Sequence, residues 1–130
     1  MRIEHLAFNV ADPVAVADWY CRNLGLTIVR HLPLPTQTHF LADDAGATVL
    51  EIYNNPPDAV PDYASMHPLQ FHLAFASESP DDDSARLIAA GASAFDEVRN
   101  PDGTLLIMLR DPWGVGLQLC KRANPLVCRA

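Results

Sequence analysis

The chain has 130 residues, 49% of them hydrophobic and 19% charged, with a formal net charge of −7. This length fits a single domain, or two small units sharing one core, and can bury roughly two thirds of the unfolded surface. The acidic excess works against nucleic-acid binding, because that affinity depends largely on Lys and Arg neutralising phosphates. No apolar run approaches the roughly 20 residues needed to cross a bilayer. We therefore expect a globular protein that binds neither nucleic acid nor a membrane.

The N-terminus and the cysteines indicate a cytoplasmic protein. Residues 1–5 lack the basic segment, apolar stretch and cleavage site of a secretory signal. Cys21, Cys120 and Cys128 are odd in number and form no Cys-x-x-Cys pair, so they predict neither a disulfide framework nor a thiolate zinc site. Free thiols in a reducing compartment are expected.

A strand is expected first, at residues 3–10, because apolar and polar residues alternate there. The alternation places Leu6 and Phe8 in the core and His5 on the opposite face. Asp12-Pro13 then forms a typical helix start, and Gly25 is a suitable helix end. Three further strands are expected, at residues 26–32, 36–42 and 47–53.

The same order of elements returns after a proline-rich linker. The second copy opens with a strand at residues 69–76, and Ser79-Pro80 starts a helix that ends near Gly91. Strands follow at residues 94–98, 105–109 and 115–120. We therefore expect one domain that consists of a first unit (1–54), a linker (55–68), a second unit (69–122) and a tail (123–130).

An internal repeat links the two units. The stretch His5-Leu6-Ala7-Phe8 returns as His72-Leu73-Ala74-Phe75, an offset of 67 residues. The same offset carries Glu51 onto Gln118, each within an apolar strand-like run. Two segments in register across half the chain indicate a duplicated unit.

Four polar side chains fall at equivalent places in the two copies: His5, Glu51, His72 and Gln118. By alternation, all four point away from the helix-covered faces, so a curved sheet could bring them into one cavity. Two imidazoles, a carboxylate and an amide oxygen suit Zn, Ni, Fe, Co or Mn. They suit Ca or Mg less well, because these ions prefer oxygen ligands throughout.

Each of these residues also has a structural interpretation. A single strand histidine is more often a surface or hydrogen-bonded residue than a ligand, an open sheet face can accommodate Glu51, and Gln118 can simply hydrogen-bond to a neighbour. Surface or pocket-wall roles are expected for the histidines without a repeat partner, His31, His39 and His67. Core or dimer contacts are expected for Trp19 and Tyr20, and a structural role in a turn is expected for Trp113.

The two units, the histidine in each opening strand and Arg110-Asp111-Pro112-Trp113-Gly114 before the last strand together resemble the vicinal oxygen chelate superfamily. This superfamily includes glyoxalase I, extradiol dioxygenases, methylmalonyl-CoA epimerase, and the fosfomycin and bleomycin resistance proteins. The resemblance covers residues 3–122 and implies a glyoxalase-like α+β fold of two tandem βαβββ units, with a curved mixed sheet around a cavity. It also implies metal ligation by His5, Glu51, His72 and Gln118.

One residue departs from the superfamily pattern. The last ligand position is commonly glutamate in the metal enzymes and is Gln118 here. Glutamine can ligate through its oxygen but cannot accept a proton at neutral pH. Glu51 is the one carboxylate among the four residues, so it is the candidate proton-transfer residue.

Three functions remain open on the sequence. The first is a metal-dependent lyase or isomerase whose single divalent ion binds vicinal oxygens of a small substrate and stabilises an enediolate while Glu51 moves the proton. The second is an Fe(II) extradiol-type dioxygenase, because His5, His72 and Glu51 make a two-histidine, one-carboxylate set. The third is a non-catalytic drug-binding protein of the bleomycin-resistance type. The resemblance also implies a homodimer.

Overall fold

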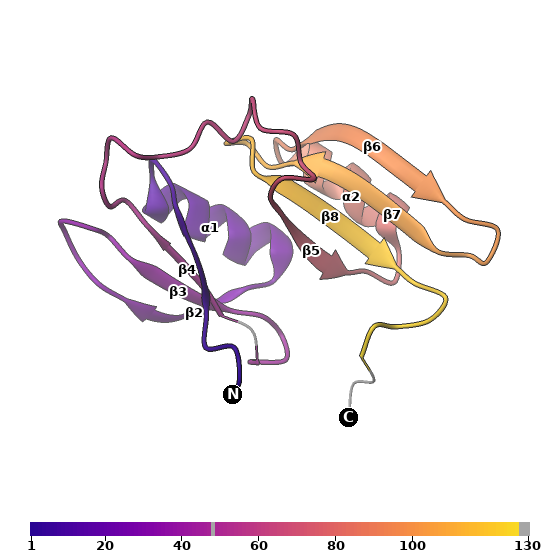
Figure 1. The fold of residues 1–130 in the computed structure, drawn as a ribbon, viewed down its shortest axis with the longest axis horizontal. Coiled ribbons are helices and arrows are strands. Elements are labelled where there is room, and N and C mark those ends of the chain that lie inside the picture. The colour runs from indigo at the N-terminus through magenta and orange to yellow at the C-terminus, as the bar shows by residue number, and fades with distance from the viewer. Residues whose placement is uncertain (48, 128–130) are drawn as a thin grey trace. The chain divides into compact units, whose positions relative to one another are not determined.

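The computed structural model describes residues 1–47 and 49–127 of two compact units, Met1–Pro61 and Asp62–Ala130. Each unit has one helix and four strands, in the order strand, helix, strand, strand, strand (Figure 1). The predicted α+β fold of two tandem βαβββ units is therefore confirmed. Thr48, in the strand expected at 47–53, lies outside the described residues, as do residues 128–130 of the expected tail, including Cys128.

The first unit is a mixed sheet with a helix on one face. Its strands lie in the order β1 (Leu6–Asn9), β4 (Val49–Tyr53), β3 (His39–Ala42) and β2 (Thr27–His31). β1 runs parallel to β4, and the other neighbours are antiparallel. Helix α1 (Pro13–Leu24) contacts β2, β3 and β4 and buries Val16, Ala17 and Tyr20 (Figure 1).

Local sequence explains both ends of α1. The backbone N–H of Ala15 donates to Asp12 Oδ1 at 3.0 Å, and Pro13 occupies the first turn, where its missing N–H costs no helical hydrogen bond. Gly25 follows the helix with φ 71°, a left-handed conformation that glycine adopts without strain. The helix start and end predicted for this segment are confirmed.

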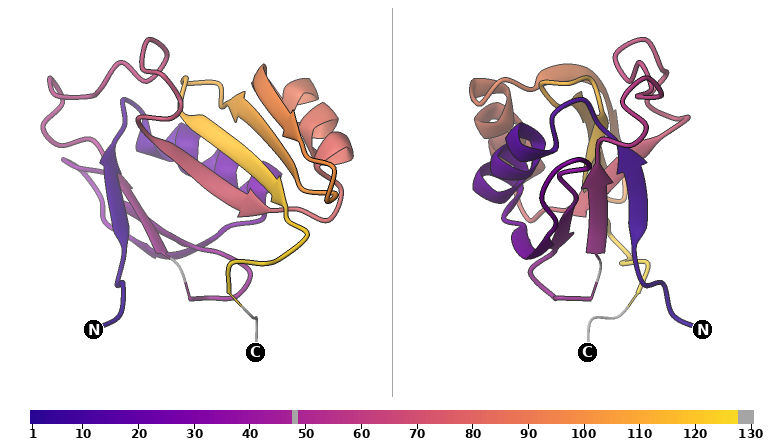
Figure 2. Two further views of the ribbon diagram at one scale, coloured as in Figure 1. Left: turned by 45° about the vertical axis from the view of Figure 1, so that its right-hand side comes forward. Right: turned by 90° about the vertical axis from the view of Figure 1, so that its left-hand side faces the viewer.

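The second unit repeats this architecture. Its strands lie in the order β5 (His72–Ala76), β8 (Gly116–Lys121), β7 (Leu105–Arg110) and β6 (Ser93–Arg99). Helix α2 (Pro80–Ala89) contacts β6, β7 and β8 and lies on one side of its sheet (Figure 2). Leu87 of α2 is buried, as are Leu109 and Leu117 of the sheet, so the core lies between helix and sheet.

The duplication predicted from the sequence extends to the strand register. In the first unit Ala7 of β1 pairs with Glu51 of β4, and in the second Ala74 of β5 pairs with Gln118 of β8. Both pairs are parallel, and both keep the 67-residue offset. The sequence therefore forms the same strand pair twice.

A β-bulge is also repeated near the start of the outer strand of each sheet. In β2 it lies between Ile28 and Arg30, and in β6 it lies between Ala94 and Asp96. Alternation within these strands did not predict either bulge. A bulge adds one unpaired residue and redirects its side chain.

The sheet faces are largely as predicted, with one correction. Phe8 is 6% exposed and belongs to the core, but Leu6 is 42% exposed and does not. Leu6 is the first residue of β1, an end strand that pairs with β4 in this sheet, so few neighbours cover it. The face of each sheet opposite its helix is called the open face below. Across residues 1–47 and 49–127, neither helix is long and apolar enough to cross a membrane.

Candidate functional site

The first unit brings His5 and Glu51 together on its open face. Glu51 lies in β4 between the buried Leu50 and Ile52, so its side chain points to the opposite side of the sheet. His5 directly precedes β1, two residues before Ala7, the strand partner of Glu51. The His5 Nε2 atom lies 3.0 Å from Glu51 Oε2, and the two side chains are 38% and 21% exposed. The pair is thus accessible from the open face.

Both ring nitrogens of His5 contact carboxylates. Nδ1 contacts the carboxylate of Glu4, and Nε2 contacts that of Glu51. The hydrogen bond with Glu4 is the main cause of a raised His5 pKa; desolvation opposes the shift, and the charges of Glu4 and Glu51 add to it. These carboxylates favour positive charge at this position, either as a proton on the ring or as a metal ion in its place.

In the second unit, the backbone holds His72 in a defined orientation. His72 Nδ1 lies 2.9 Å from the carbonyl oxygen of Pro68, which can only accept a hydrogen bond. Nδ1 therefore carries the proton, and Nε2 keeps the lone pair that a metal ligand needs. Gly116 leaves room for this side chain, because a Cβ there would lie 2.9 Å from His72 Cβ.

Gln118 lies on the same open face of β8, half-buried between Leu117 and Leu119 in the chain. Its Oε1 accepts a weak hydrogen bond from Cys120 Sγ at 3.3 Å. Desolvation is the main cause of a raised Cys120 pKa, so this thiol stays neutral and remains a donor. Gln118 thus offers a neutral amide where the first unit offers a carboxylate.

The donor chemistry of these residues fits a divalent ion. Two metal bonds of about 2.1 Å place their donors about 3 Å apart at a right angle and about 3.4 Å apart at a tetrahedral angle. The 3.0 Å between His5 Nε2 and Glu51 Oε2 is compatible with both atoms binding one ion. Within residues 1–47 and 49–127, no three His, Cys, Asp or Glu side chains form a group that could hold a metal. Each unit instead brings two potential donors to its open face.

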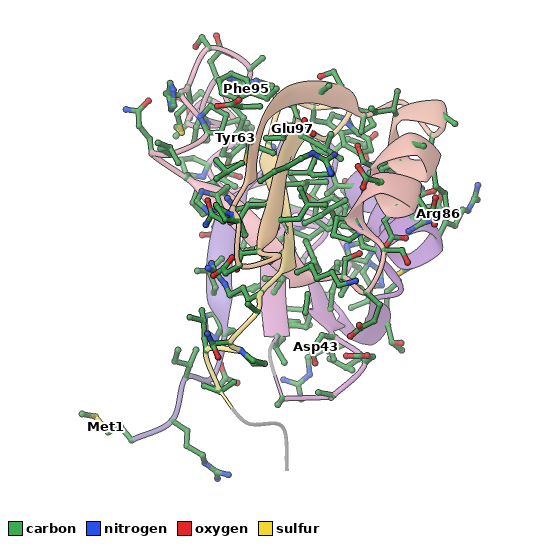
Figure 3. The ribbon with its side chains drawn as sticks, turned by 90° about the vertical axis from the view of Figure 1, so that its right-hand side faces the viewer. Met1, Asp43, Tyr63, Arg86, Phe95 and Glu97 are labelled. Atoms are coloured by element: carbon green, nitrogen blue, oxygen red, sulfur yellow. The ribbon has the colours of Figure 1, made fainter. Side chains whose placement is uncertain are left out.

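A pocket lies beside Gln118 on the open face of the second unit. Its volume is about 150 Å³, and its lining includes Phe95 and Met108 together with the segment 67–69. Phe95 is the extra residue of the β6 bulge and lies on the side of β6 away from α2 (Figure 3). The His67 and Phe95 rings meet edge to face at 5.4 Å. The bulge and the 67–69 segment therefore shape the pocket.

Arg110 holds residues 63–66, which precede the 67–69 segment, against the open face. Its Nη1 donates to the carbonyl oxygens of Tyr63 at 2.8 Å and Gly114 at 3.0 Å, and its Nη2 donates to that of Met66 at 2.8 Å. The guanidinium also lies 5.1 Å from the centre of the Phe95 ring. Arg110, in β7, thus contacts both the bulge residue Phe95 and the segment that leads into the pocket wall at residues 67–69.

The family model for the glyoxalase-like domain matches residues 5–120. The chain belongs to this family. The match begins at His5, the first predicted metal ligand, and ends at Cys120, two residues after the last predicted ligand, Gln118. No curated protein matches this glyoxalase-like chain.

Solved structures agree with this assignment at the level of the fold. The glyoxalase family protein from Bacillus cereus has a TM-score of 0.78 at 16% identity, over 92% of this chain and 93% of that one. The glyoxalase family protein from Enterococcus faecalis has a TM-score of 0.70 at 25% identity, over 92% and 97%. A glyoxylase/bleomycin resistance protein/dioxygenase domain from Frankia sp. EAN1pec has a TM-score of 0.66 at 22% identity, over 92% and 96%. With the family match, they place the chain in the vicinal oxygen chelate superfamily, whose members usually use a divalent metal, bind small molecules and often form dimers.

The structure places the remaining histidines of this glyoxalase-like protein in three different settings. His31 is exposed, whereas His39 is only 6% exposed, which corrects the surface or pocket-wall role expected for it. His39 pairs with the buried Ile52 across β3 and β4, and its Nδ1 donates to the Gln37 carbonyl oxygen at 2.7 Å. His67 lines the pocket, as one of its two expected roles allowed.

The expected aromatic roles also have outcomes. Tyr20 is fully buried in the core, and Trp19 is half-buried beside it, with ring centres 5.9 Å apart. The Trp113 backbone N–H donates to Asp111 Oδ1 at 2.9 Å, so Trp113 is part of the turn before β8. Roles at the pocket were not predicted for Phe95, Met108 or Arg110, although Arg110 belongs to the turn motif that supports the superfamily resemblance. Apolar residues at alternate, open-face positions of β7 were the available signal for the pocket.

Proposed function

We propose that this glyoxalase-like protein is a metal-dependent lyase or isomerase that acts on a small substrate with vicinal oxygens. One divalent ion, from among Zn, Ni, Fe, Co and Mn, would be held by His5, Glu51, His72 and Gln118. The observation that carries the proposal is the 3.0 Å approach of His5 Nε2 to Glu51 Oε2 at the position equivalent to Gln118. The 67-residue equivalence supports adding the second pair to the first.

The bound ion would supply Lewis-acid polarisation and a template for the two substrate oxygens. His5 would bind through Nε2, and the Glu4 carboxylate at Nδ1 would hold its ring and raise its basicity. His72 would bind through Nε2, with Nδ1 held by the Pro68 carbonyl. Both histidines thus have the outer hydrogen-bond partner typical of metal-ligating imidazoles.

Glu51 would move the proton. It is the one ionisable carboxylate among the four donors. Its side chain is half-buried, so few water molecules would have to move when the carboxylate changes from metal ligand to base. Gln118 has no titratable group and would bind through Oε1, after giving up the weak contact with Cys120. The first unit would thus supply the base, and the second unit would supply a neutral ligand.

Elemental analysis tests the metal and its carboxylate together. Purified, untagged protein should hold close to one divalent ion per chain, and Glu51→Ala should lower its affinity at least about tenfold. The matched control is Glu97→Ala, which removes the same charge from a carboxylate paired with Arg99 instead of a histidine. Negligible metal in both native and reconstituted wild-type protein would reject the proposal.

A non-catalytic binding protein is the second candidate, because the apolar pocket beside Gln118 needs no metal to hold a ligand. Ligands would then stabilise the protein in a thermal-shift screen equally with and without a chelator, and equally in Glu51→Ala. Stabilisation that depends on the ion and on Glu51 would favour the enzyme.

A further inference from the structure

We propose that the pocket beside Gln118 holds a six-membered ring, or an apolar group of that size, on a neutral or cationic ligand. In the proposed enzyme this group would be the part of the substrate next to its vicinal oxygens, so that placement rests on the proposed function. Binding of the ring itself does not require the ion.

Much of the pocket wall consists of apolar side chains, and a β-bulge positions one of them. Met108 of β7 pairs with Gln118 on one side and with Asp96 on the other, and these three form a row across the open face. The bulge between Ala94 and Asp96 inserts Phe95 beside this row. Phe95 is 45% exposed, although it contacts His67 and Arg110, so part of its ring remains available to a ligand.

The volume sets the size of the ligand. A cavity of about 150 Å³ lined by aliphatic and aromatic side chains accommodates a benzene-sized molecule. The volume of this pocket is about 150 Å³, and Phe95, Val98, Leu106 and Met108 supply apolar surface. Gln118 lines the same pocket and provides an amide group there. A ring with one polar substituent directed at Gln118 therefore matches both size and polarity.

The first unit has different residues at the equivalent positions. Phe40 is the β3 partner of Glu51, as Met108 is the β7 partner of Gln118, and the Phe40 ring lies 6.4 Å from the His5 ring. Val29 occupies the bulge position that Phe95 occupies in the second unit. The phenylalanine at the bulge is thus specific to the second copy.

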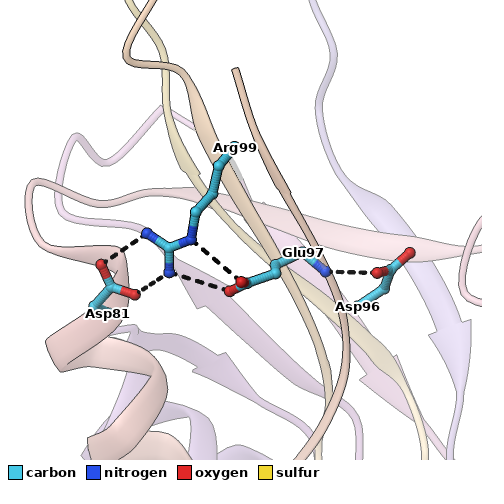
Figure 4. Close-up of polar contacts among 4 residues, drawn as sticks. All are labelled: Asp81, Asp96, Glu97 and Arg99. Carbon is cyan, nitrogen blue, oxygen red and sulfur yellow. Dashed lines mark hydrogen bonds and ion pairs between the residues drawn. The ribbon is translucent and has the colours of Figure 1, made fainter. Parts of the chain in front are cut away.

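The charges around the pocket disfavour anions. Asp96 lines it from the open face, whereas the carboxylate of Glu97, another lining residue, is paired with Arg99. No Lys or Arg is among the lining residues in the part of the chain that the structure describes. Arg99 is close in sequence, but its guanidinium is held between Asp81 and Glu97 on the helix side (Figure 4). Arg110 uses its Nη atoms on three backbone carbonyls. A carboxylate or phosphate would therefore meet the Asp96 carboxylate, and it could bond to Arg110 only in place of these backbone hydrogen bonds.

The test titrates the full-length protein with benzyl alcohol, benzylamine and benzoate, which share a ring and differ in charge, with amide NMR signals as the readout. Benzyl alcohol and benzylamine should shift the amide signals of Phe95, Met108 and Gln118 saturably, in metal-free and metal-loaded protein alike. Benzoate should bind at least about threefold more weakly, because the Asp96 carboxylate repels its negative charge.

Two variants of similar exposure make the test specific. Phe95→Ala removes an aromatic wall and should weaken benzyl alcohol binding at least about fivefold. Val29→Ala truncates the equivalent bulge residue of the first unit, 58% exposed, and should leave binding unchanged. Absence of saturable shifts in wild-type protein, or equal binding by both variants, would overturn the proposal. Benzoate binding as tightly as benzylamine would overturn the charge preference.

The outcomes separate this inference from the proposed function. Metal uptake without ring binding would overturn the pocket and leave the metal-dependent enzyme standing. Ring binding by a protein that takes up no metal would support the pocket and reject the enzyme.

Discussion

Glu51 and Gln118 show how one exchanged group differentiates two copies of a strand. Each lies in the last strand of its unit, flanked by buried residues, and each pairs with an alanine of the opening strand. The backbone therefore presents them identically, and only the ionisable oxygen of Glu51 distinguishes their chemistry. Any proton transfer in the proposed reaction is accordingly assigned to the first unit.

Gly116 is predicted to be required for the position of His72. A Cβ on residue 116 would lie 2.9 Å from His72 Cβ and 3.0 Å from the Phe71 carbonyl oxygen, so Gly116→Ala must displace one of them. We expect a loss of about 1–3 kcal/mol in the free energy of unfolding by urea, as for other overpacked sites. Because His72 is a proposed ligand, metal affinity should also fall at least about tenfold.

The control for this variant comes from the repeat. Val49 of β4 is 67 residues before Gly116 and carries a side chain without such a conflict. Val49→Ala should therefore change metal affinity by less than about twofold. Equal metal affinity in Gly116→Ala and wild-type protein would show that His72 tolerates the displacement or does not bind the ion.

Strand alternation predicted the faces of individual residues well where the strand is regular. It placed Glu51 and Gln118 on the side of the strand opposite their buried neighbours, and the structure confirms both placements. The same alternation explains why His39 is buried, because His39 shares the parity of the buried Leu41 in β3. It could not predict the direction of Phe95, because a bulge shifts the parity by one residue and has no clear signal in a single sequence.

At the scale of elements, the start of α2 differs from the start of α1. Ser79 occupies the cap position, but its side chain makes no capping hydrogen bond. Ser77 Oγ instead donates to Asp83 Oδ2 at 2.6 Å, and Arg86 donates to the other oxygen of the same carboxylate at 3.0 Å. The helix start was predictable from Ser79-Pro80, but the serine that does the bonding was not, because it lies outside the helix.

Asp83 makes the stability of this element depend on pH. The hydrogen bond from Ser77 is the main cause of a lowered Asp83 pKa, with desolvation opposing it and Arg86 contributing further. A lowered pKa in the folded state stabilises the protein above the ordinary value of 3.8, and this stabilisation is lost as the pH falls below it. Ser77→Ala should thus cost about 1 kcal/mol near pH 6 and clearly less near pH 2.5, after discounting for solvent screening.

Urea unfolding of wild-type and Ser77→Ala protein at the two pH values measures this difference. Ser84→Ala, a half-buried serine of the same helix, serves as the control and should cost the same at both pH values. A cost of Ser77→Ala that does not change with pH would show that the hydroxyl acts through packing instead of through the carboxylate.

At the scale of the whole molecule, the repeat was the most informative feature of the sequence. It predicted two βαβββ units, and the shared register of β1 with β4 and β5 with β8 confirms it. The pocket escaped prediction because the copies diverge there, with Phe95 and Met108 where the first unit has Val29 and Phe40. A repeat in the sequence thus predicts the structure that the two copies share, but it does not predict a site formed by residues that differ between them.

The proposed ion makes a prediction about both units together. If one ion takes donors from each unit, its binding free energy is lost when either unit unfolds. At a free concentration 100 times the Kd this amounts to about 2.7 kcal/mol, or a rise of roughly 10 °C in Tm for a chain of this size.

His5→Ala and His72→Ala remove one donor from each unit, and each should abolish most of that rise in a thermal scan with added divalent ion. His31→Ala, an exposed histidine outside the donor set, should retain it. A rise that disappears in His5→Ala but persists in His72→Ala would mean that the first unit holds the ion alone through its 3.0 Å pair, and the role of the second unit would then reduce to its pocket.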